Sequence, residues 1–314
     1  MADIFVRPYD QQRRPPTRLI VTALVVLAIT AAVTGLWIWF DSRPAKAPAA
    51  KPAVQEKRAA EPVKAQAPAV PNGDSQAQQL FTRAQSLITA GKLEQASDLL
   101  DEVITTAADE NLKNNALRVQ GRMNVQLFLS STPTSWKKIY VIQPGDSLDR
   151  IARQNKTTIE LIRKMNDIEG NLIYPGRRLL LPASPFVVKV DKSDRTLDLT
   201  MNGKLFKRYI VGVGMNGKTP TGTFLTVVHQ TNPDWTPPGG GIIPFGDPKN
   251  ILGTRWMSIQ DATRPDIKGF GIHGTPLRDS IGAETSNGCV RMLNEDVEEL
   301  YLLIPRGTEV SISE

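Results

Sequence analysis

Hydrophobic positions are distributed unevenly along the chain, and the first long run of them lies near the N-terminus. Residues 19–40 contain no charged side chain, so as a transmembrane helix they are long enough to cross a hydrocarbon core of about 30 Å. Arg13, Arg14 and Arg18 precede the run, and the positive-inside tendency therefore predicts that residues 1–18 are cytoplasmic. We expect a single-pass protein of the inner (cytoplasmic) membrane whose later residues are extracytoplasmic, in the periplasm or cell wall.

The segment after this run offers an alternative interpretation. Ala45, Lys46 and Ala47 form a small-x-small pattern that suits a signal-peptide cleavage site. The apolar run is longer than the roughly 7–15 residues of a signal peptide, which favours an uncleaved anchor. Residues 41–75 are dominated by Ala, Pro, Lys and Glu and lack aromatic residues, a composition typical of a solvated linker.

Apolar residues recur at helical spacing over residues 76–130. Leu80, Ala84 and Leu87 share one face of a first helix, and Gly91 separates it from a second. This α-helical segment resembles tetratricopeptide-type repeats. Its apolar faces suit either packing between helices or a groove for a protein partner, and the pattern leaves both open.

A different pattern begins at residue 138. Turn residues separate a short strand at 139–141, helices at 148–154 and 158–165, and a closing strand at 179–181. Asp146 is expected to cap the first of these helices. The order predicts a small α+β (βααβ) module.

From residue 186 onward apolar and polar residues alternate, which indicates β-structure. Asn202-Gly203 is expected to form a hairpin turn, and the many Gly and Pro residues between 233 and 253 predict a long loop. Only residues 294–303 have a helical pattern. The stretch 186–313 is therefore predicted to be a mainly-β domain.

Charge and composition exclude some functions. Lys and Arg exceed Asp and Glu by 38 to 32, without the long basic tracts that would indicate a nucleic-acid partner. Cys289 is the only cysteine, so no internal disulfide is possible. One cysteine and two histidines are too few for an ordinary zinc site, and we expect neither a metal nor a cofactor.

Cys289 and His273 are the candidate reactive pair. A thiol attacks as a thiolate and its free pKa is about 8.5, so we expect an imidazole or a positive charge to lower the pKa of an active cysteine. Gly274 and Gly288 would let a substrate backbone approach, and amides near Gly288 and Cys289 could stabilise an oxyanion. From these residues alone, a buried structural cysteine and a satisfied histidine remain open alternatives.

The βααβ module resembles a LysM domain over residues 138–183. The residues that carry the resemblance are Tyr140, Val141, Gly145-Asp146-x-Leu148, Ile151-Ala152, Asn166 and Pro175-Gly176-x-x-Leu179-x-x-Pro182. The resemblance implies binding to glycans that contain N-acetylglucosamine, here the glycan strands of peptidoglycan. It places the following residues at the groove: Gly145, Asp146, Ser147, Leu148, Ile173 and Tyr174. Capping helices and closing turns is an equally good explanation of these residues.

The β-domain resembles the L,D-transpeptidase catalytic domain over residues 186–313. Four motifs carry this resemblance: Gly212-x-Gly214, Thr219-Pro220-Thr221-Gly222-x-Phe224, His273-Gly274-Thr275 and Ser286-x-Gly288-Cys289-Val290-Arg291-Met292. It implies a β-sandwich-like fold and an enzyme, a cysteine acyltransferase. In this family the cysteine attacks a peptidoglycan stem tetrapeptide and releases D-alanine. The acyl group then passes to an amine, giving a 3–3 cross-link, or to water, giving L,D-carboxypeptidase cleavage.

The resemblance also assigns roles by position. It implies that Cys289 is the nucleophile and His273 the base, with the Gly274 carbonyl orienting the imidazole. Arg291 could attract the substrate's terminal carboxylate or join an internal ion pair, and Ser286 could donate to substrate or only shape the turn. The predicted substrate-binding residues are Arg291, Ser286, Asn287 and Thr275.

One position departs from the family pattern, which has histidine two residues before the cysteine. Asn287 occupies it here, and an amide cannot take up a proton. His273 is then the base candidate, because His229 lies on a predicted strand well upstream. The departure also motivates an alternative, a peptidoglycan-binding scaffold whose catalytic domain has lost its activity.

Overall fold

The computed structural model describes residues 73–314 except residues 238, 262 and 265. The predicted transmembrane run 19–40 and most of the linker 41–75 lie outside this part. Within it, no helix is both long and apolar enough to cross a membrane. The membrane anchor therefore stays a prediction.

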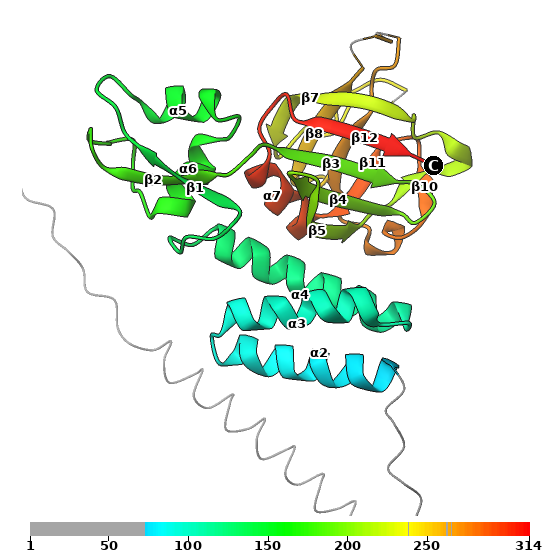
Figure 1. Cartoon of the computed structure of the whole chain (residues 1–314). Helices are drawn as coiled ribbons and strands as arrows, with labels where there is room; N and C mark the ends of the chain where they lie inside the picture. The colour runs from blue at the N-terminus through cyan, green and yellow to red at the C-terminus, as the bar shows by residue number, and fades with distance from the viewer. Residues whose placement is uncertain (1–72, 238, 262, 265) are drawn as a thin grey trace, which may run out of the picture. The chain divides into compact units, whose positions relative to one another are not determined.

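Three helices open the described part of the chain: α2 (Gly73–Thr89), α3 (Leu93–Thr106) and α4 (Glu110–Phe128) (Figure 1). Gly91, at φ 73°, makes the turn between α2 and α3, as its position in the apolar pattern predicts. Small residues let the two helices approach, since Ala77, Ala84 and Ala96 are fully buried between them. The helical pattern seen in the sequence thus corresponds to a helical core of its own.

The next module has the predicted order of strand, helix, helix and strand. It consists of β1 (Lys137–Val141), α5 (Leu148–Gln154), α6 (Ile159–Asn166) and β2 (Arg178–Pro182), with β1 and β2 antiparallel. The expected cap of α5 is wrong: Ser147 accepts from the Arg150 amide at 3.2 Å, whereas Asp146 accepts from the Gln143 amide at 2.7 Å. Asp146 closes the turn before the helix, and the next residue caps it.

Ten strands, two short 3-10 helices and one α-helix form the last domain. They are β3 (Phe186–Asp191), β4 (Thr196–Met201), β5 (Lys204–Ile210), β6 (Val213–Gly214), η1 (Met215–Gly217), β7 (Gly222–Thr231), β8 (Arg255–Gln260), β9 (Gly271–Thr275), η2 (Arg278–Ser280), β10 (Glu284–Ser286), β11 (Val290–Leu293), α7 (Asn294–Leu303) and β12 (Glu309–Ser313). Eight strands make one mixed sheet in the order β11-β9-β8-β7-β12-β3-β4-β5. The predicted hairpin at Asn202-Gly203 joins β4 to β5, and the predicted long loop separates β7 from β8.

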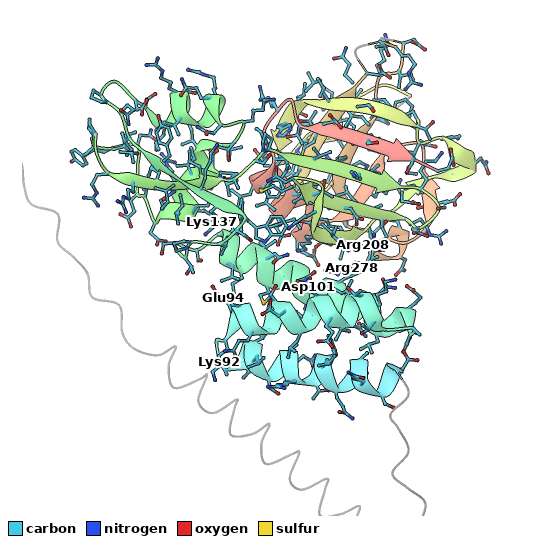
Figure 2. All side chains as sticks on the ribbon, in the orientation of Figure 1. Lys92, Glu94, Asp101, Lys137, Arg208 and Arg278 are labelled. Atoms are coloured by element: carbon cyan, nitrogen blue, oxygen red, sulfur yellow. The ribbon has the colours of Figure 1, made fainter. Side chains whose placement is uncertain are left out.

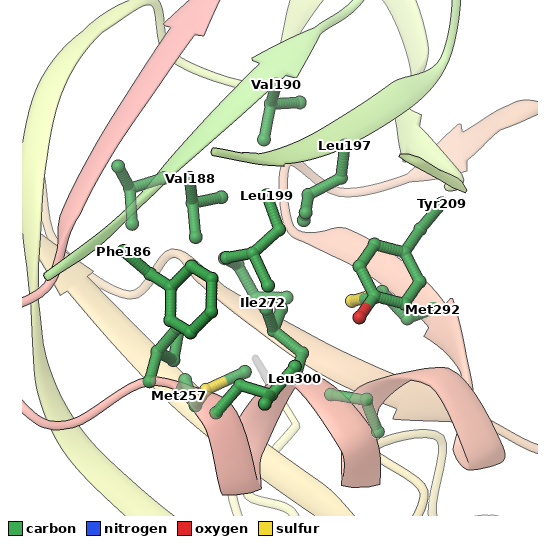
Figure 3. Close-up of a cluster of buried hydrophobic side chains, with 14 of the residues drawn as sticks. Phe186, Val188, Val190, Leu197, Leu199, Tyr209, Met257, Ile272, Met292 and Leu300 are labelled. Atoms are coloured by element: carbon green, nitrogen blue, oxygen red, sulfur yellow. The ribbon is translucent and has the colours of Figure 1, made fainter. Parts of the chain in front are cut away.

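The eight-stranded sheet curls so that its two ends face each other across one core (Figure 3). Val188 and Leu199 from β3 and β4 lie opposite Ile272 and Met292 from β9 and β11, and all four are fully buried. Leu300 of α7 packs into the same cluster. The sandwich-like appearance expected for this domain thus comes from a single continuous sheet.

Helix α4 packs on β5, the last strand of that sheet. The Asn124 side-chain amide donates to the Phe206 carbonyl at 2.8 Å, and the Phe128 ring meets those of Phe186 and Phe206 edge to face. An edge strand with unpaired backbone groups would otherwise invite pairing with another chain. One apolar face of the helical segment is therefore used within the molecule, and a protein partner on its other faces stays a prediction.

Lys137 holds the chain where α4 gives way to β1 (Figure 2). Its buried ammonium group donates to the carbonyls of Leu127, Ser130 and Thr132. Burial lowers the pKa of Lys137 to about 8. The three carbonyl oxygens near the end of α4 thus obtain a donor that the helix itself cannot supply.

Candidate active site

Four adjacent strands contribute one residue each to a single row across the sheet. Gln230 on β7 pairs with Trp256 on β8, Trp256 pairs with His273 on β9, and His273 pairs with Arg291 on β11. Residues paired across strands point to the same face. The adjacent pair of the same two strands, Met257 and Ile272, is buried in the core, so the row points away from it.

This row forms one wall of a cavity of about 520 Å³ that also contains Cys289. Cys289 directly precedes β11, so the sheet places it beside the row. Trp235 and Phe270 close other sides from the loops before β8 and β9, and the charged side chains of Asp234 and Lys268 reach the same cavity. Residues far apart in sequence therefore surround the only thiol of the chain.

His273 is held by a backbone oxygen. Its side chain is buried, and Nδ1 lies 2.6 Å from the Gly274 carbonyl oxygen. A carbonyl can only accept, so Nδ1 carries the proton and Nε2 keeps its lone pair. Burial lowers the pKa of His273 to about 4, with a smaller contribution from the Arg291 charge, and the ring is neutral at pH 7.

The Cys289 thiol is protonated at rest, contrary to the expected low-pKa thiolate. Burial raises the pKa of the thiol, although the Gly271 amide and the Arg291 charge act in the opposite direction. The sulfur lies 3.9 Å from the Gly269 carbonyl oxygen, and the hydrogen bonds of residues 73–314 (238, 262 and 265 apart) include none between Cys289 and His273. The site therefore contains a neutral thiol and a neutral imidazole.

Ser286 shapes the turn that carries the thiol. Its hydroxyl donates to the Cys289 carbonyl at 2.7 Å and accepts from the Gly288 amide at 3.0 Å. Gly288 has φ 125°, and a Cβ there would lie 2.4 Å from the Phe270 ring, so only glycine fits. The Gly288 amide, one of the expected oxyanion donors, is already occupied, which corrects that expectation.

Arg291 has free hydrogen-bonding capacity at the cavity. Its Nη1 donates to the Thr285 hydroxyl at 3.2 Å, while its buried Nε has no hydrogen-bond partner in the structure. The salt bridges among the described residues include none with Arg291. The internal ion pair considered for this residue is thus absent from that part of the chain.

The other predicted substrate-binding residues differ in position. Asn287 is exposed and lines the cavity. Thr275 is buried, its hydroxyl accepts from the Leu277 amide at 3.1 Å, and it does not reach the cavity lining. The structure brings Cys289, His273, Arg291, Ser286 and Asn287 together and leaves Thr275 apart.

The predicted glycan-binding residues mostly have local structural partners. Asp146 accepts from the Tyr140 hydroxyl at 2.7 Å, Ser147 caps α5, and Leu148 is buried. Gly145 makes a turn at φ 83°, and Ile173 packs on the module's core. Tyr174 is 59% exposed, which makes it the most accessible large side chain of this set.

Sequence motifs missed several residues of the cavity, above all Gln230 and Trp256. Their signal is the alternation of inward and outward positions along β7 and β8. That alternation becomes useful only once the register with β9 is known, because Trp256 lies seventeen positions before His273 in the chain and directly opposite it in the sheet. Fold and site together define a cysteine–histidine site on a curled β-sheet, joined to a small βααβ module.

Comparison with known proteins assigns both parts to families. Residues 185–312 match the L,D-transpeptidase catalytic domain and residues 140–182 match the LysM domain, which confirms both resemblances. Over 183 residues the chain is 34% identical to a putative L,D-transpeptidase, YkuD, of Bacillus licheniformis; the match spans 56% of this chain and 98% of that protein. The chain therefore belongs to the L,D-transpeptidase family.

One further relative agrees with this assignment, and a solved structure was also matched. The chain is 37% identical over 143 residues to a putative L,D-transpeptidase, YqjB, of Bacillus subtilis, covering 45% of this chain and 78% of that protein. A solved L,D-transpeptidase structure from Stackebrandtia nassauensis matches with 24% identity and a TM-score of 0.32, covering 42% of this chain and 57% of that chain.

Proposed function

We propose that the protein is a peptidoglycan L,D-transpeptidase that uses Cys289 as its nucleophile. The thiolate attacks the carbonyl of the third residue of a stem tetrapeptide, D-alanine leaves, and the acyl-enzyme is transferred to an amine to form a 3–3 cross-link. The observation that carries this proposal is the single cavity that contains Cys289 and a histidine whose Nδ1 is fixed on the Gly274 carbonyl.

The neutral state of both groups determines how the thiol is activated. Because neither group is charged at rest, His273 Nε2 takes the thiol proton as sulfur approaches the carbonyl carbon, and the imidazolium then protonates the leaving amine of D-alanine. Because Nδ1 stays bonded to the Gly274 carbonyl, Nε2 is the nitrogen that first accepts and then donates this proton. In the Ser286 turn the Cys289 amide takes the place of the occupied Gly288 amide as oxyanion donor.

Arg291 is proposed to hold the terminal carboxylate of the donor peptide. Its guanidinium borders the cavity with a buried Nε that lacks a partner, and a carboxylate would satisfy it. Water in place of an amine acceptor would turn the same acyl-enzyme into an L,D-carboxypeptidase. Weighing the products of defined muropeptides distinguishes the two outcomes.

The LysM module is proposed to bind glycan strands next to the site of reaction. Attachment to glycan would raise the local concentration of stem peptides around Cys289 without any new contact at the cavity. The exposed Tyr174 is the residue of the predicted groove best placed to contact a sugar face. A membrane anchor at residues 19–40 would hold the molecule at the outer face of the inner membrane, which fractionation of cells expressing the full chain would test.

The deciding experiment uses Cys289→Ala. This variant should lose all turnover of disaccharide tetrapeptides, while its binding to insoluble peptidoglycan equals that of the unaltered chain. Tyr174→Ala is the matched control, with weaker glycan binding and normal turnover of soluble muropeptides. Unchanged product formation by Cys289→Ala would rule out the proposed nucleophile.

The raised pKa of Cys289 favours one alternative, a peptidoglycan-binding scaffold without catalysis. A static thiol titration cannot separate it from an enzyme that removes the proton during attack. Incubation with a carbapenem-type β-lactam can, because an active site acquires the mass of one inhibitor at Cys289. A scaffold acquires none.

A further inference from the structure

Trp256 makes a close contact with the imidazole that no motif assigns. It lies directly opposite His273 in the antiparallel pairing of β8 and β9, and both side chains line the cavity. The two ring centroids are 5.7 Å apart and the ring planes are inclined by 35°. The two rings are therefore neighbours in a tilted arrangement, neither parallel nor edge to face.

The first residue of β9 leaves room for this indole. A Cβ on Gly271 would lie 2.8 Å from Cη2 of Trp256 and 2.9 Å from Cζ2, which is closer than carbon atoms approach. The same Cβ would lie 2.6 Å from the Met257 carbonyl oxygen, so the close approach of the β8 backbone also excludes a side chain at Gly271. The missing side chain thus leaves room both for the β8 backbone and for the Trp256 indole beside His273.

Hydrogen bonds alone do not fix the tilt of the His273 ring. The ring nitrogens meet the Gly274 oxygen and the Leu252 backbone in the plane of the ring, so these contacts do not press on its faces. Packing of a flat side chain beside the ring restricts this tilt. These contacts together fix the direction in which the Nε2 lone pair points.

We propose that Trp256 is a positioning residue, whose indole packs beside the His273 ring, restricts its tilt and keeps water from it so that Nε2 is aimed at the thiol. This inference rests on the proposed function of His273 as the base. Trp256 itself exchanges no proton and forms no bond with the substrate.

The charged groups around the imidazole are few, which makes the effect measurable. Arg291 faces His273 from β11, the Cys289 thiol shares the cavity, and Asp234 and Lys268 border it from the loops. Trp256 and Gln230 contribute no charge. Replacing Trp256 by Ala therefore changes the exposure of the ring to water while every charge stays.

Histidine NMR provides the test, because the chain has only two histidines. In the full-length chain with His229→Gln, the one remaining ring signal belongs to His273. We expect Trp256→Ala to raise the pKa of His273 by about 1–2 units, since water regains access to the charged form. Trp256→Phe, which keeps a flat apolar face, should give a smaller rise.

Trp235→Ala is the matched control. It also removes an indole from the cavity, but the aromatic contact with His273 comes from Trp256, and the pKa of His273 should stay unchanged. A pKa that is the same in the unaltered chain and in Trp256→Phe and Trp256→Ala would overturn the proposal. If Trp256→Ala does not fold, the Phe variant alone decides it.

The pH profile of kcat/KM separates this inference from the proposed function. Trp256→Ala should lower kcat more than it changes KM, with its acid limb moved upward by the same shift that NMR measures. If the unaltered chain forms no acyl-enzyme while the NMR shift occurs, the proposed function fails and the contact stands. If the unaltered chain is active and Trp256→Ala keeps its pH profile, the positioning role is wrong.

Discussion

The two histidines of the chain have similar acid–base properties and different surroundings. His229 on β7 and His273 on β9 both have their pKa lowered to about 4, chiefly by burial. Both lie on strands of the same sheet. A lowered pKa by itself would make each of them a candidate base.

Their partners separate them. His273 faces the cavity with Nδ1 on the Gly274 oxygen, whereas the buried Nε2 of His229 has no hydrogen-bond partner in the structure. The His229 ring packs 5.2 Å from that of Tyr301 on α7, and its neighbour Gln230 is the residue that reaches the cavity. A depressed pKa reports burial, whereas the oriented hydrogen bond beside a thiol is what supports His273 as the proposed base.

The largest expected effect is on turnover. His273→Ala should reduce kcat/KM by about 10²–10⁴-fold, the range supplied by a positioned general base. His229→Ala should remain within about threefold of the unaltered chain, because its ring does not reach the cavity. Steady-state kinetics on a disaccharide tetrapeptide measures both. An equal loss of kcat/KM in the two variants would contradict the assignment of His273 alone as the base.

Stability should respond to both histidines, unlike turnover. The folded-state pKa of His273 lies below the ordinary 6.5, so the unfolded chain takes up a proton that the folded chain refuses as pH falls from about 6.5 to about 4. Folding stability attributable to this group is therefore lost on acidification, by about 3 kcal/mol in total.

Urea unfolding at pH 7 and pH 4.5 measures this loss. His273→Gln should be less acid-sensitive than the unaltered chain, and His229→Gln should change in the same direction by a similar amount, because the pKa of each ring is lowered to about 4. Carboxylates contribute equally in all three proteins, so the difference between them isolates the imidazoles. An acid response that neither substitution alters would contradict the burial of the two rings.

Two serines extend the comparison to the surroundings of each histidine. Ser286 bonds the Cys289 carbonyl and the buried Gly288 amide, whereas Ser258 accepts at 3.0 Å from the exposed Val228 amide beside His229. Ser286→Ala should lower the free energy of unfolding by about 1–3 kcal/mol, because the Cys289 carbonyl and the Gly288 amide lose their hydrogen-bond partner. Ser258→Ala should cost less, since water replaces its hydroxyl. Thermal unfolding of the two variants measures both losses of stability. Equal losses would contradict the difference in burial.

Local patterns predicted much of the fold. The helices Leu148–Gln154 and Asn294–Leu303 begin and end where their apolar spacing and flanking residues indicate. The turn at Asn202-Gly203 follows from two residues that adopt positive φ, at 51° and 74°. These features depend on residues that are close together in the sequence, so the sequence pattern is enough to predict them.

Features that depend on residues far apart in the sequence could not be predicted from local patterns. The contact of Trp256 with His273 requires the register of β8 and β9, and the packing of α4 on β5 requires the closed sheet. The pKa of Cys289 is likewise raised by burial. The motif that contains Gly288 and Arg291 does not reveal how deeply the thiol is buried. The sequence motifs identified Cys289 and His273 as candidates, whereas the shifts of their pKa values depend on the fold.

The smallest expected effect concerns Asn287, where the family pattern has a second imidazole close to the thiol. Asn287 is exposed at the cavity and has no hydrogen bond among those of the described residues. In Asn287→His the new ring would titrate near its free pKa of about 6.5, and an exposed charge contributes about 0.2–1 kcal/mol. We therefore expect kcat/KM at pH 8 within about twofold of the unaltered chain, and at most about fivefold higher at pH 5.5, where the added positive charge favours the thiolate. A change of more than tenfold at pH 8 would show that a second neutral imidazole assists the thiol, so that His273 would no longer account for its activation alone.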